Sequence, residues 1–129
     1  MLSTYNRVTR WPRYSEPQEY MVLGKRATKN EYNVAMALDK MEYGYLFQVT
    51  YWGGRSVIGG QVLDFLVFLP APIPVQVYGE YWHTGQLSSD DRYNEIQIAN
   101  MVGQYPVILW GSETETVEDA TSALKRKVL

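Results

Sequence analysis

The segment that most restricts the fold is residues 62–85, where three prolines separate two apolar stretches. Its sequence is VLDFLVFLPAPIPVQVYGEYWHTG. Short apolar runs bounded by Pro or Gly are typical of buried strands, so we predict two strands joined by a Pro-rich turn. Asp64 lies within the first strand, and Glu80 and the only histidine, His83, follow the second. A buried carboxylate is costly unless it is paired or holds a metal, so this segment is also the first candidate for a functional site.

The rest of the sequence alternates helical and strand-like patterns, which predicts an α/β fold of order αβββαβα. Thr28 and Glu31 fit a capping box, and Val34, Leu38 and Met41 follow at helical spacing. Glycines and prolines separate the later segments. We predict helices over residues 28–43, from 88 or 89 to 102, and 116–127, and strands over residues 46–51, 57–68, 75–78 and 106–110.

Composition narrows the kinds of site that the chain can build. The 129 residues are 46% hydrophobic and 14% aromatic, which favours one packed domain. The absence of cysteine excludes disulfides and thiolate zinc sites, and a single histidine excludes a site of several histidines. A metal would be held mainly by oxygen atoms, which favours Mg²⁺ or Mn²⁺. No apolar run approaches the ~20 residues that span a bilayer, so we expect a soluble cytoplasmic protein with no membrane partner.

The N-terminal part is basic although the net charge of the chain is −2. Residues 1–29 hold six basic and two acidic groups, whereas the remainder holds six basic and twelve acidic groups. We therefore predict an extended basic and aromatic arm over residues 1–27 and a single domain over 28–129. Arginines interleaved with flat rings can contact phosphates and stack on bases. The alternative is an arm whose rings dock on the body and whose arginines are solvated. The candidate nucleic-acid contacts are Arg7, Arg10, Trp11, Arg13, Lys25 and Arg26.

These elements carry a resemblance to a known superfamily. The order αβββαβ with an aspartate in the second strand resembles the core of the restriction-endonuclease-like, or PD-(D/E)xK, nucleases. The sequence GEYWH at residues 79–83 resembles the Gly-x-aromatic-Trp-His pattern of very-short-patch-repair endonucleases. The chain is also similar to small phage and bacterial proteins related to them, in which GGxVxDF precedes GEYWH. The resemblance covers about residues 28–111.

The resemblance implies a mixed four-stranded sheet flanked by helices and a Mg²⁺-dependent DNA endonuclease. Such an enzyme hydrolyses phosphodiester bonds in branched, mismatched or distorted DNA, as a phage Holliday-junction resolvase does. The implied metal ligands are Asp64, the main-chain carbonyl of Val77 and Glu80. His83 would act as acid, base or transition-state stabiliser, and Glu31 of the first helix would face the metal. A homodimer would suit symmetric cleavage of a junction, while a monomer could nick at a mismatch.

Each of these residues also has a structural interpretation. Asp64 could pair with an arginine or cap backbone amides, and Glu31 could simply complete the capping box with Thr28. Glu80 could be a solvated acid at a strand end, and His83 a polar strand-end residue bonded to a carboxylate.

Two positions depart from the family motif. The third strand usually carries an acid and, two residues later, a lysine, but Gln76 and Tyr78 stand there. The repair endonucleases also lack the lysine but have a histidine where this chain has Tyr78. A second hypothesis is therefore a relative of the fold that does not cleave and binds nucleic acid or protein in a phage or bacterial assembly.

Overall fold

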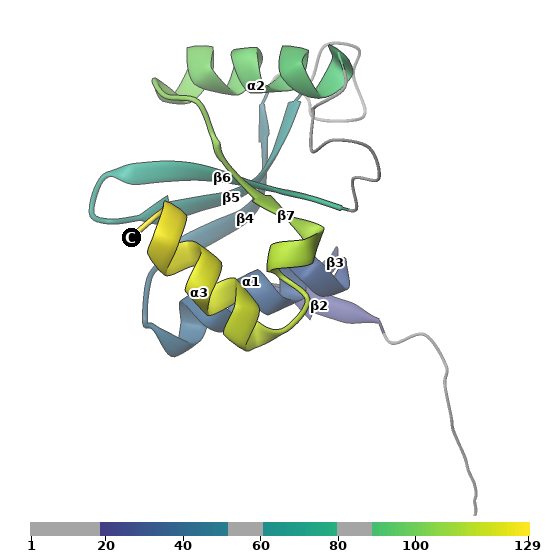
Figure 1. The fold of residues 1–129 in the computed structure, drawn as a ribbon. Coiled ribbons are helices and arrows are strands. Elements are labelled where there is room, and N and C mark those ends of the chain that lie inside the picture. The colour runs from purple at the N-terminus through teal and green to yellow at the C-terminus, as the bar shows by residue number, and fades with distance from the viewer. Residues whose placement is uncertain (1–18, 52–60, 80–88) are drawn as a thin grey trace, which may run out of the picture.

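The protein is an α/β domain built around one mixed sheet of four strands (Figure 1). The computed structural model describes residues 19–51, 61–79 and 89–129. The strands lie in the order β4-β5-β6-β7, so β5 and β6 are interior. The predicted mixed four-stranded sheet is confirmed. Its strands are β4 (Tyr45–Tyr51), β5 (Gln61–Phe68), β6 (Pro72–Tyr78) and β7 (Val107–Trp110).

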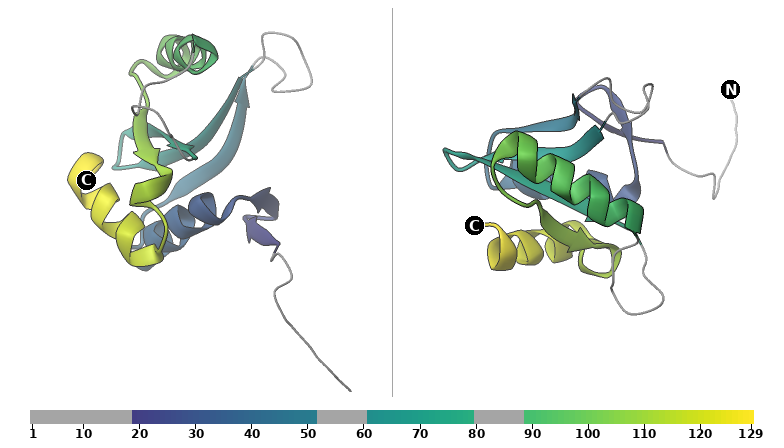
Figure 2. Two further views of the ribbon diagram at one scale, coloured as in Figure 1. Left: turned by 45° about the vertical axis from the view of Figure 1, so that its right-hand side comes forward. Right: turned by 90° about the horizontal axis from the view of Figure 1, so that it is seen from above.

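Helices cover the two sides of this sheet unequally. Helices α1 (Lys29–Lys40) and α3 (Val117–Lys127) pack against each other on one side. Helix α2 (Ser89–Val102) lies on the other side, as both views of Figure 2 show. Within the described ranges, no helix is long and apolar enough to cross a membrane.

The hydrophobic core lies between the sheet and the α1–α3 pair. Apolar side chains at every second position of β5 and β6 point to this side, as expected for strands with one face on a core. The ring of Phe65 packs against those of Tyr45 and Phe47, with centroids 5.7 and 5.0 Å away. The fully buried members of this cluster are Val34, Ala35, Ala37, Leu38, Phe65, Val67, Val75, Leu109, Ala120, Ala123 and Leu124.

The pairing of β6 changes along its length. Strands β4, β5 and β6 are antiparallel, whereas β6 and β7 are parallel. Backbone pairing between β5 and β6 ends at Phe65 and Val75. From Val75 to Tyr78, β6 continues to pair with β7. The sheet therefore forks between β5 and β6, next to Asp64.

Local signals place the helix ends close to their predicted positions. Thr28 and Glu31 form the predicted capping box, with bonds of 3.1 and 2.9 Å. Helix α1 ends earlier than residue 43, because Glu42 adopts a left-handed conformation with φ 63°. Helix α2 ends at Val102 before Gly103, which has φ 96°.

A β-hairpin precedes α1, so residues 20–27 do not form part of an extended arm as predicted. Strands β2 (Tyr20–Val22) and β3 (Lys25–Ala27) are antiparallel. They are joined by Leu23 and Gly24, both at positive φ, as the tight turns of hairpins require. The hairpin belongs to the body because Val22 is buried in the core. Residues 1–18 lie outside the described part of the chain.

Lysine side chains bond to both edge strands of the sheet. Lys25 Nζ donates to the carbonyl oxygens of Phe47 (3.0 Å) and Gln48 (3.3 Å) in β4. Lys127 Nζ donates to the carbonyl oxygen of Ile108 in β7 at 3.0 Å. The hairpin and α3 are thereby each tied to one edge.

Candidate functional site

The candidate site is built around Asp64, a buried carboxylate in an interior strand. The predicted position of Asp64 in a central strand is confirmed, and only 8% of the residue is exposed. Because strand side chains alternate, Asp64 leaves β5 on the face opposite to the core residue Phe65. This is the side of the sheet on which α2 lies.

Two hydrogen bonds join Asp64 to β6 where the backbone pairing ends. The backbone N–H of Val77 donates to Asp64 Oδ2 at 2.8 Å, and the N–H of Asp64 donates to Gln76 Oε1 at 2.7 Å. The carboxylate thus caps a backbone amide, which confirms one of the structural interpretations of Asp64. An ionised carboxylate can accept about four hydrogen bonds or ligand contacts, so this bond does not use up its capacity.

The carbonyl of Val77 lies on the same edge of β6 as its amide. In an extended strand, the N–H and C=O of one residue leave the backbone on one side, which is why paired residues exchange both bonds. Since the Val77 N–H points to Asp64, the Val77 carbonyl also faces the fork. Two oxygen donors that the resemblance implies for a metal are therefore neighbours here.

Gln76, which stands where the motif of the resembled nucleases has an acid, makes a structural hydrogen bond. Gln76 is 3% exposed, and its Oε1 satisfies the Asp64 amide. Tyr78, in the lysine position, packs its ring against Trp110 with centroids 5.7 Å apart. Nothing in the sequence signals the bond between Gln76 and Asp64, because it depends on where the two strands part.

The structure uses Glu31 as a helix cap. Its Oε1 accepts from the Thr28 N–H, which confirms the capping interpretation. Helix α1 also covers the core side of the sheet, whereas Asp64 leaves on the opposite face. The predicted role of Glu31 at a metal therefore gains no support from its position.

Glu80 and His83 lie outside the described residues, as do Arg7, Arg10, Trp11 and Arg13. Within residues 19–51, 61–79 and 89–129, no three His, Cys, Asp or Glu side chains come together in a metal-binding group. Of the predicted donors, the described part contains Asp64 and Val77 at one place. The roles of Glu80 and His83 stay predictions.

The two described nucleic-acid candidates, Lys25 and Arg26, both belong to the hairpin and both have partners. Lys25 bonds to β4, and Arg26 Nη2 lies 2.7 Å from Glu19 Oε2. Both side chains of this ion pair are well exposed, so it is screened by water and weak. Arg26 is therefore available to bind a phosphate, whereas Lys25 would first have to give up its hydrogen bonds to the β4 carbonyls.

Sequence reasoning missed a second charged cluster, which centres on Glu113. Its carboxylate accepts from Lys127 Nζ (2.7 Å), Arg126 Nη2 (2.8 Å) and the Trp110 N–H (3.0 Å). Burial favours the neutral acid, but these donors outweigh it and lower the pKa of Glu113. The cluster fastens the end of α3 to β7.

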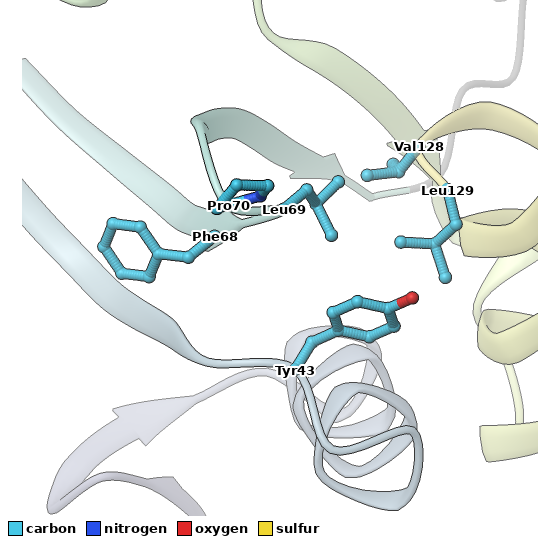
Figure 3. A pocket seen from close by; sticks show the side chains of 6 residues that line it. All are labelled: Tyr43, Phe68, Leu69, Pro70, Val128 and Leu129. Atoms are coloured by element: carbon cyan, nitrogen blue, oxygen red, sulfur yellow. The ribbon is translucent and has the colours of Figure 1, made fainter.

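An apolar pocket of about 510 Å³ lies at the turn end of β5, away from the fork (Figure 3). The side chains of Leu69, Leu129 and Tyr43 converge on it in the close view. Its lining contains no acidic, basic or histidine side chain, and its polar side-chain group is the hydroxyl of Tyr43. It is lined by Tyr43, Phe68, Leu69, Pro70, Val128 and Leu129.

Comparison of the chain with protein-family models, curated protein sequences and solved structures gave no match.

Proposed function

We propose that the protein is a metal-dependent endonuclease that hydrolyses phosphodiester bonds in branched, mismatched or otherwise distorted DNA. The observation that carries the proposal is the buried carboxylate of Asp64 at the fork between β5 and β6, beside the backbone of Val77. A charge in an interior strand is costly to maintain unless it is paired or holds a metal.

The donors suit a hard divalent cation. Asp64, the Val77 carbonyl and Glu80 would hold Mg²⁺ or Mn²⁺, which both prefer oxygen ligands. Such an ion, when bound, neutralises phosphate charge and lowers the pKa of an attacking water. His83 would accept the proton of that water or donate one to the leaving oxygen, work that suits an imidazole near neutral pH. Arg26 and the basic residues before it would contact the DNA backbone.

The test is cleavage of labelled duplex, mismatched, flapped and four-way-junction DNA with Mg²⁺ or Mn²⁺. Asp64→Asn keeps the size and an acceptor for the Val77 amide but removes the charge. The matched control is Glu118→Gln, which removes an exposed acid from α3. We expect metal-dependent cutting by the wild type and the control, and none by Asp64→Asn. Cutting that survives in Asp64→Asn would refute the metal role of Asp64.

A second candidate is a non-catalytic module that binds nucleic acid or a protein. It is favoured by the two bonds between Asp64 and β6, because they give the buried carboxylate a structural role without chemistry. Retained binding to branched DNA without cleavage, by the wild type in both metals, would support this candidate over the nuclease.

A further inference from the structure

We propose that Gln48 is a positioning residue for Asp64. Gln48 interrupts the β4–β5 ladder opposite Asp64, so the Asp64 N–H does not pair with β4. This N–H donates to the Gln76 side chain instead, and that bond keeps the Asp64 carboxylate at the fork between β5 and β6. The metal-binding part of this inference rests on the proposed nuclease function, whereas the backbone part does not.

The register shows where the ladder is interrupted. Strands β4 and β5 pair continuously on either side, through Phe47 with Phe65 and Val49 with Leu63. The pair between them, Gln48 with Asp64, is missing although the register is unchanged. Gln48 has φ 55°, a left-handed conformation that is rare for a residue with a side chain and unusual within a strand.

The direction of the neighbouring bonds shows what the interruption changes. The N–H of Phe68 donates to the Gly44 carbonyl on the β4 side. Because strand amides alternate in direction, the Asp64 N–H of a regular β5 would also face β4, toward Gln48. It instead donates to Gln76 in β6. The peptide before Asp64 is thus turned from one neighbouring strand to the other.

The β2–β3 hairpin holds Gln48 in its unusual conformation. Gln48 Nε2 donates to the Arg26 carbonyl at 3.1 Å, and the Gln48 carbonyl accepts from Lys25 Nζ at 3.3 Å. The carbonyl that would have accepted the Asp64 amide therefore has a replacement donor. The donor and the acceptor of this missing hydrogen bond, the Asp64 N–H and the Gln48 carbonyl, are therefore both satisfied elsewhere.

This arrangement makes the position of Asp64 depend on the hairpin. If Gln48 returned to a regular strand conformation, the Asp64 amide would pair with β4 and lose its bond to Gln76. The side chain of Asp64 would then turn with its backbone, away from the Val77 amide and carbonyl. Gln48 acts on the site only through Asp64.

The test compares Gln48→Val with Gln48→Gly in the full chain by amide NMR and Mn²⁺ titration. Valine strongly disfavours positive φ, whereas glycine accepts it. We expect Gln48→Val to shift the amide signals of Asp64 and Val77 and to weaken Mn²⁺ binding at least about tenfold, as loss of an outer-shell partner does. Gln48→Gly loses the bond to the Arg26 carbonyl, but glycine accepts positive φ and keeps the backbone carbonyl for Lys25, so this variant should retain both properties far better than Gln48→Val. Thermal unfolding of each variant confirms that it is folded, and Lys25→Met is the second route to the same change if Gln48→Val does not fold.

The outcomes separate the inference from the proposed function. Wild-type protein in which Mn²⁺ broadens no signal near Asp64 and Val77 would refute the metal site and the metal-binding part of this inference. The backbone part would then be decided by the amide signals alone, and unshifted Asp64 and Val77 amides in Gln48→Val would refute it. Mn²⁺ binding that is present in the wild type and equally strong in Gln48→Val would refute the inference alone. Shifted amides with weaker Mn²⁺ binding in Gln48→Val, but not in Gln48→Gly, would support it.

Discussion

The backbone N–H of Val77 donates to Oδ2 of Asp64 at 2.8 Å. If the ladder between β5 and β6 continued, this amide would donate to the carbonyl of Leu63, the residue opposite Val77 in the register. A side chain has therefore taken over the task of a backbone acceptor, and the two strands can separate without leaving a buried amide unsatisfied. The same carboxylate is the metal ligand that the sequence predicts.

The structural part of this role can be measured by substitution. We expect Asp64→Ala to lower the free energy of unfolding by about 1–3 kcal/mol, because the buried Val77 amide loses its acceptor. Asp64→Asn retains an oxygen in the same place and should lower it by less than Asp64→Ala. Urea unfolding followed by tryptophan fluorescence gives both values. Equal losses of stability in the two variants would show that the acceptor for the Val77 N–H is unimportant. The loss would then come from removing the negative charge of Asp64.

Glu113 should make the stability of the protein sensitive to acid. Its pKa is lowered in the folded state despite burial, because Lys127, the Trp110 amide and Arg126 donate to it. A carboxyl group with a lowered folded pKa stabilises the protein above its unfolded pKa, and the stabilisation is lost as the pH falls through the folded value. We expect Glu113→Gln to lower the free energy of unfolding by about 1–2 kcal/mol at pH 7. The difference from the wild type should shrink as the pH is lowered below about 4, and a difference that stays constant with pH would contradict this account.

Tyr45 should remain protonated to unusually high pH. Burial, followed by the charge of Asp39 and a hydrogen bond to its carboxylate, raises the pKa of Tyr45 to about 12. The protonated phenol therefore stabilises the fold below pH 10, and this contribution is lost as the pH rises through about 12. NMR of ¹³C-labelled tyrosine rings separates this residue from the other tyrosines. In Asp39→Asn the pKa should fall but stay raised, because burial remains; an unchanged value would exclude the Asp39 contribution.

Thr114 joins the start of α1 to the turn after β7, and its hydroxyl should matter more than its volume. The residue is fully buried, and its Oγ1 accepts from Asn30 Nδ2 at 2.9 Å and donates to the Trp110 carbonyl at 3.1 Å. Thr114→Val keeps the shape but removes the acceptor, so we expect a loss of about 1–3 kcal/mol in the free energy of unfolding.

The matched control is Thr121→Val on α3. The Thr121 hydroxyl donates to the Val117 carbonyl one turn earlier, a bond of a kind that helps a helix little. Its replacement should change the free energy of unfolding by less than about 0.5 kcal/mol. Similar losses at both positions, measured in the same urea titrations, would show that the buried position of Thr114 has no special role.

The regular elements could be predicted because their signals are local. The capping box of Thr28 and Glu31, the glycine at 103 and the apolar run around Asp64 each constrain a few neighbouring residues. The mixed four-stranded sheet was expected from the resemblance and is confirmed. The β2–β3 hairpin was missed because its turn uses Leu23, a poor residue for positive φ, and its strands contain three residues each. Tertiary contacts with α1 outweigh the weak local preference.

The burial of Asp64 in a central strand could be predicted, but its contacts could not. A lone acid in an apolar strand identifies Asp64, since burial makes it costly without a partner. The partners themselves are the Val77 amide and Gln76, one a backbone group and the other a neutral side chain. Neither partner has a signature in the sequence, because each lies 12 or 13 positions from Asp64 along the chain. Their roles arise only because the backbone pairing of β5 with β6 ends beside Asp64. The role of Glu113 was also missed, since two of its donors, Arg126 and Lys127, come from α3, 13 and 14 positions away.

The two lysines on the edge strands determine how other molecules can approach the sheet. A strand from another chain would extend β4 or β7 by bonding to their outward carbonyls, which is how unprotected edges template aggregation. Lys25 on Phe47 and Gln48, and Lys127 on Ile108, already engage carbonyls there and bring a positive charge to each edge. Growth of the sheet at either edge would have to displace the lysine ammonium group that is bonded there, so each edge is protected against a further strand.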